Sequence, residues 1–106
     1  MSSIDRATES FVRAIKSSEE YLAYRAELEK ILGQPGLKER IDEFRERNFR
    51  MQAEQDIDFE RLDRFEKEYE NFRQEPLVAD FLAAELAFCK MMQEATDEII
   101  REIDFQ

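Results

Sequence analysis

Glycine and proline are scarce in this chain, which has only two of each among 106 residues. A turn-rich β fold needs these residues at its many reversals, whereas long helices do without them. Apolar residues also recur at intervals of three and four, the spacing of one face of a helix. The sequence therefore predicts a single all-α domain over residues 1–106, built of long antiparallel helices that pack as hairpins or a bundle.

Local signals divide the chain into about five helices. Ser17 followed by Glu20 reads as a capping box, which would start a second helix directly after the first. The segment 33–36 is the clearest break, because Pro35 cannot continue a helix and Gly33 suits a left-handed position after its end. The predicted helices cover residues 4–16, 19–32, 37–55, 59–74 and 76–103.

The predicted fifth helix is too long for a compact chain of this size. About 28 residues span roughly 42 Å in a helix, whereas a compact domain of this length has a radius of gyration of only ~13 Å. Its end still carries apolar side chains, which need a cover. We therefore predict a homodimer or a larger homo-oligomer, with an interface that includes Ile99, Ile100, Ile103 and Phe105.

The net charge of the chain limits the kinds of partner that it is expected to bind. The net charge is −10, so direct contact with nucleic acid or an anionic membrane surface is not expected. Residues 37–53 are the least acidic segment, with a net charge of +1. A mixed surface of arginine and aromatic residues is typical of protein interfaces, although a solvated helix end with incidental ion pairs is the alternative. The candidates for a partner-binding patch are Arg40, Phe44, Arg47 and Gln52.

No catalytic, cofactor-binding or metal-ligating residue is expected. The chain lacks histidine, the commonest general base and metal ligand, and its two glycines form no phosphate-binding loop. Cys89, the one cysteine, falls on the apolar side of the fifth helix and is expected to be a small buried residue. The alternatives are a redox sensor or one ligand of a cluster shared between chains. Neither a signal peptide nor an 18-residue apolar run occurs, so the expected location is the cytoplasm.

Glu85 leaves a second hypothesis open. It lies on the apolar stripe of the fifth helix, where an unpaired carboxylate is costly, so we expect it to pair with an arginine or a backbone group. Carboxylates brought together across an oligomer axis would instead suit a helical bundle that binds a small ligand or a metal.

Three segments, in order, resemble the YlbF/YmcA family of bacterial proteins, which includes the YheA-like proteins. They are Ser18-Glu19-Glu20-Tyr21, Ile41-Asp42-Glu43-Phe44, and the stretch 75–85 that opens the fifth helix. The resemblance implies long antiparallel helices that associate into dimers or larger forms. It also implies a regulatory, non-enzymatic role of the kind linked to competence, sporulation and biofilm development.

The resemblance further implies partners among proteins. Characterised relatives act in a complex with one another and affect ribonuclease Y and RNA maturation, so paralogous helical proteins or an RNA-processing complex are the expected partners. Some relatives are associated with iron–sulfur clusters through cysteines near the C-terminus. Residues 101–106 contain no cysteine, and Cys89 alone cannot hold a cluster in one chain, so no cofactor is expected here.

Overall fold

The computed structural model describes residues 1–104. Within this range the chain forms five α-helices and no strand, which confirms the all-α prediction. Each helix begins and ends within two residues of its predicted bounds. The helices are α1 (Ser3–Lys16), α2 (Glu19–Leu32), α3 (Leu37–Ala53), α4 (Phe59–Arg73) and α5 (Pro76–Glu102).

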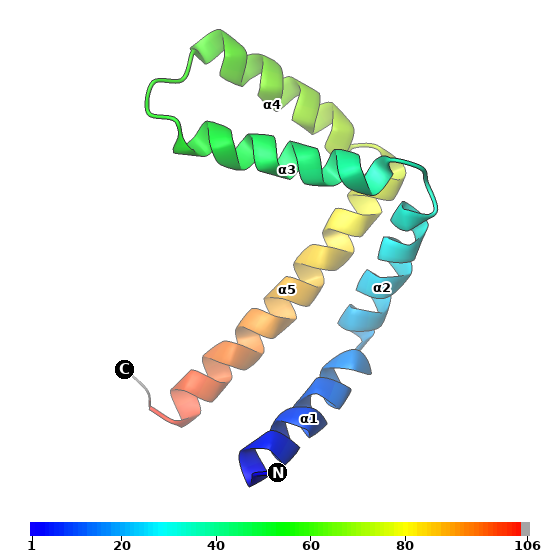
Figure 1. The fold of residues 1–106 in the computed structure, drawn as a ribbon, viewed down its shortest axis with the longest axis vertical. Coiled ribbons are helices and arrows are strands. Elements are labelled where there is room, and N and C mark those ends of the chain that lie inside the picture. Colours follow the sequence, from blue (N-terminus) through cyan, green and yellow to red (C-terminus); the bar gives the residue numbers. More distant parts are fainter. Residues whose placement is uncertain (105–106) are drawn as a thin grey trace.

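The helices form an open shape. α1 and α2 follow one another along one arm, α5 runs back beside them as a second arm, and the α3/α4 hairpin projects from the end where α2 and α5 meet (Figure 1). The molecule measures 54 × 37 × 21 Å and has a radius of gyration of 18.2 Å. A compact domain of this length would have a radius of only ~13 Å, so the arms extend well beyond a single packed core.

The core lies where α2, α3, α4 and α5 converge. Every buried apolar side chain found in the described residues falls between positions 28 and 81. α1 contributes none of them, and α5 contributes only two, both in its first two turns. The core residues are Leu28, Ile31, Leu37, Ile41, Phe44, Phe65, Phe72, Val78 and Phe81.

Phe44, predicted as a partner contact, is instead part of this core. Its side chain is only 8% exposed. Its ring stacks on Phe72 at 4.5 Å and on Tyr69 at 5.5 Å between ring centroids. Phe44 is therefore not available to a partner in this fold, because α4 folds back along α3 and the rings of Tyr69 and Phe72 cover it.

Cys89 was predicted to be buried, and this prediction is wrong because its side chain is exposed. The helical stripe to which it belongs continues past Phe81, the last buried residue of α5. Beyond that point α2 lies beside only part of the α5 surface, so a position on the stripe is no longer enclosed.

Two turns also differ from the sequence-based prediction. The hydroxyl of Ser18, and not that of Ser17, caps α2 by accepting the Tyr21 backbone N–H at 3.1 Å. Gly33 keeps a right-handed conformation with φ −73°. The left-handed residue is Gly36, with φ 77°, where the chain reverses into α3.

Candidate interaction surfaces

The two arms present apolar side chains to solvent along most of their length. At the end of α5, Ile99 is 50% and Ile103 is 66% exposed. These residues were predicted at an interface, and the structure leaves them uncovered within one chain. The large exposed apolar residues of the arms are Ile4, Phe11, Val12, Leu22, Leu32, Leu86, Ile99, Ile100 and Ile103.

Two apolar grooves run between the arms. The first, of about 350 Å³, lies between α1 and α5 and is lined by Phe11, Ile99 and Ile103 among others. The second, of about 500 Å³, lies between α2 and α5. In the second groove Phe88 meets Tyr21 and Tyr24 edge to face, with ring centroids 5.5 and 5.4 Å apart. Both grooves are open hollows in a surface that a partner chain could cover.

The accessible surface is large for the mass of the chain. It amounts to 8355 Å², whereas a compact monomer of 12.7 kDa exposes about 6,200 Å². The excess of about 2,000 Å² is as large as the area that one subunit contributes to an extensive dimer interface.

The α3/α4 hairpin carries the other predicted contacts. Arg40 lies 3.7 Å from the Glu75 carboxylate and stacks over the Phe72 ring at 4.7 Å. Gln52 is exposed near the end of α3. Phe105 was also predicted at an interface, but it lies outside the described residues.

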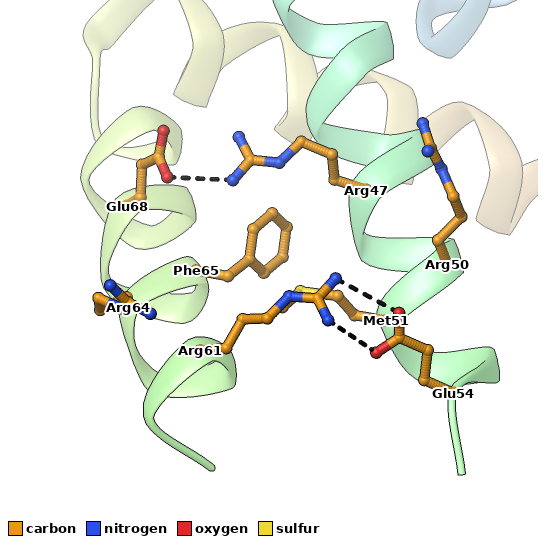
Figure 2. A pocket seen from close by; sticks show the side chains of 8 residues that line it. All are labelled: Arg47, Arg50, Met51, Glu54, Arg61, Arg64, Phe65 and Glu68. Carbon is orange, nitrogen blue, oxygen red and sulfur yellow. Dashed lines mark hydrogen bonds and ion pairs between the residues drawn. The ribbon is translucent and has the colours of Figure 1, made fainter. Parts of the chain in front are cut away.

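Arg47, the remaining predicted contact, lines a groove between α3 and α4 near the turn that connects them. Figure 2 shows this groove, which has a volume of about 410 Å³. Two ion pairs cross it. Arg47 donates to Glu68 at 3.2 Å, and both terminal nitrogens of Arg61 contact Glu54, at 3.2 and 3.3 Å. We call it the arginine groove; its lining residues are Arg47, Arg50, Met51, Glu54, Arg61, Arg64, Phe65 and Glu68.

Sequence reasoning missed the α4 half of this groove. Residues 54–75 carry a net charge of −5, and that average hid Arg61 and Arg64. The spacing of the arginines could have predicted the cluster. Two arginines three residues apart precede the turn, Arg47 and Arg50, and two more with the same spacing follow it, Arg61 and Arg64. A helical hairpin brings two such pairs together beside its turn.

Glu85 forms the pair that its position predicted. Its carboxylate accepts a hydrogen bond from Arg45, which ties α5 to α3. The Arg45 guanidinium also lies 5.9 Å from the centroid of the Phe81 ring. The Glu85 carboxylate is thus neutralised within one chain. Over residues 1–104, no three histidine, cysteine or acidic side chains come together as a metal site would require.

No helix in the described part of the chain combines the length and the apolar character that a membrane span requires. The surfaces described above are the apolar arms and the arginine-rich hairpin. Together they define an open, all-α protein whose distinctive features are surfaces for contact.

Comparison with known families identifies the family of this chain. The chain belongs to the family described as "Control of competence regulator ComK, YlbF/YmcA", whose match covers residues 4–104. This is a regulatory family associated with competence. The resemblance inferred from the sequence is thereby confirmed.

One curated relative supports the same assignment. The chain is 34% identical over 80 residues to the UPF0342 protein STH1710 of Symbiobacterium thermophilum, a match that covers 72% of this chain and 71% of the relative. No solved structure matches the chain.

Proposed function

We propose that this chain is a non-enzymatic regulatory adaptor, which forms a homodimer through its arms and presents the α3/α4 hairpin to a protein partner. The observation that carries the proposal is the uncovered apolar surface of α1 and the outer part of α5. Membership of a regulatory family supports the regulatory role.

The chemistry of the arms favours a second copy as their cover. The arms bear large aliphatic side chains, and contiguous exposed patches of this kind mark interfaces. Burial of about 25 cal/mol per Å² of apolar surface makes such a patch costly to leave in water. Two copies related by a twofold axis would bring their grooves face to face, so that each arm covers the other.

The proposed partners are proteins. Paralogous helical proteins of the same family, or a complex that processes RNA, are the partners that the family resemblance implies. The net charge of −10 disfavours direct contact with RNA. The proposed setting is the cytoplasm, which suits a chain with a single cysteine.

Charge introduced at the end of α5 tests the dimer. We expect the double variant Ile99→Asp with Ile103→Asp to be monomeric in light scattering after size exclusion, because two carboxylates would be buried in the interface. Leu32→Asp is the matched control, because Leu32 is 58% exposed but lies at the far end of α2. It should keep the mass of the wild type. Equal masses for all three proteins would exclude the arms as the interface.

A further inference from the structure

We propose that the arginine groove between α3 and α4 binds a short acidic peptide segment of a partner protein, one with an apolar side chain among its carboxylates. This inference rests on the proposed function, because it names the chemistry of the segment that the hairpin would receive. Four observations carry it: local charge, exposed ion pairs, an apolar floor and acidic surroundings.

The local charge of the groove opposes that of the chain. Four arginines and two glutamates line it, which leaves two positive charges in a protein of net charge −10. Arg64 forms no ion pair within residues 1–104, and Arg50 pairs only along its own helix, with Glu46 at 3.1 Å. These two guanidinium groups stand at the α4 and α3 rims of the groove (Figure 2).

The ion pairs that cross the groove are exchangeable. The Arg61 side chain is 55% exposed and its partner Glu54 is 39% exposed, and pairs of this kind contribute at most about 1 kcal/mol. The planar guanidinium of Arg61 already faces a carboxylate through both terminal nitrogens (Figure 2). An incoming carboxylate can adopt the same two-point geometry while Glu54 returns to solvent.

The floor of the groove is apolar. Phe65 is buried beneath the arginines, with the Arg47 guanidinium 4.9 Å from its ring centroid, and Met51 is partly buried beside it. Methionine adapts its shape to different apolar neighbours. Because Phe65 is already covered, the partly exposed Met51 is the apolar surface that a ligand can reach. A peptide with one aliphatic side chain between acidic ones would cover Met51, whereas a ligand that carries only charges would leave it in contact with water.

Acidic surroundings favour a short segment over a nucleic acid. The outer surface of α4 carries Glu60, Glu66 and Glu70, and segment 54–75 as a whole is acidic. RNA carries phosphates along its entire length, so it would meet these carboxylates as soon as it left the groove. A few carboxylates held within about 410 Å³ avoid that repulsion.

Fluorescence anisotropy with a labelled peptide of alternating glutamate and leucine tests this site. We expect wild-type protein to bind the peptide, and added salt to weaken the binding. The double variant Arg50→Glu with Arg64→Glu should bind at least about tenfold more weakly, since both rim charges are reversed. The matched control is Arg6→Glu with Arg25→Glu, which reverses two exposed arginines on the α1/α2 arm, away from the groove, and should bind as the wild type does.

Several outcomes would overturn the inference. Equal peptide affinity in the groove variant and the wild type would do so, as would no wild-type binding at about 1 mM peptide. A single-stranded polyuridine probe that bound through the groove where the peptide did not would replace the peptide with RNA. A mass above that of a dimer that disappeared in the groove variant would identify the occupant as another copy of this chain.

The same samples keep the two proposals apart. The groove lies on the hairpin, away from the arms (Figure 1), so the groove variant should keep the dimer mass in light scattering. A monomeric wild type that still binds the peptide through the groove would refute the proposed dimer alone. A dimeric wild type with no groove-dependent binding would refute the peptide site alone.

Discussion

At the scale of single residues, the structure separates two aromatic side chains that lie on the same helix. Phe44 is enclosed by α4, whereas Phe49, five residues later, is 74% exposed. The sequence showed that Phe44 belongs to an apolar stripe, but it did not show which element covers that stripe. The same gap explains Cys89, whose stripe continues past the point where another helix covers it.

The two phenylalanines provide a direct test of the hairpin core. Phe44→Ala should lower the free energy of unfolding by about 3 kcal/mol, because it empties a stacked aromatic site. Phe49→Ala should change it by less than about 0.5 kcal/mol. Urea denaturation followed by circular dichroism measures both values. Similar small losses for the two variants would mean that α4 does not pack on Phe44.

The sequence predicted the positions of the hairpin arginines only in part. Arg40 and Arg47 stood out because their segment is mildly basic, yet each is paired with an acidic residue of α4 or the turn after it. Arg61 and Arg64 lay hidden in an acidic segment. The net charge of a segment sums the charges on all faces of a helix, whereas a groove is lined by one face only. The arginine cluster is therefore apparent only in the folded hairpin.

At the scale of elements, helix bounds were largely predictable and turn conformations were not. Apolar spacing and Pro76 at the start of α5 are local properties, so the sequence alone located the helices. The conformation within segment 33–36 depends on how α2 and α3 are oriented around the core. Both glycines could have supplied the left-handed residue, and the structure places it at Gly36.

Alanine substitutions at the two glycines test this assignment. Gly36→Ala should lower the free energy of unfolding by about 1 kcal/mol, because alanine is strained at a φ of 77°. Gly33→Ala should be neutral within about 0.5 kcal/mol, since its new Cβ would meet the Lys30 carbonyl oxygen at an ordinary 3.4 Å. Thermal or urea unfolding would reveal the difference. The reverse order would place the left-handed residue at position 33.

At the scale of the whole molecule, one small core supports arms that extend far beyond it. Contacts among α2, α3, α4 and α5 hold the chain together, while α1 and the outer part of α5 contribute no fully buried side chain among the described residues. The length of α5 was predictable from the sequence, and it indicated a shape that one chain cannot make compact. The α3/α4 hairpin at the other end depends on contacts between helices, which local sequence patterns do not predict.

The measurement that tests the account most directly is the molar mass of the purified wild-type chain, by light scattering after size exclusion at micromolar concentration, with and without reductant. We predict about twice 12.7 kDa in both conditions, because apolar arms and not a bond through the exposed Cys89 hold the dimer together. A mass of 12.7 kDa in both conditions, or a dimer that reductant abolishes, would contradict the account.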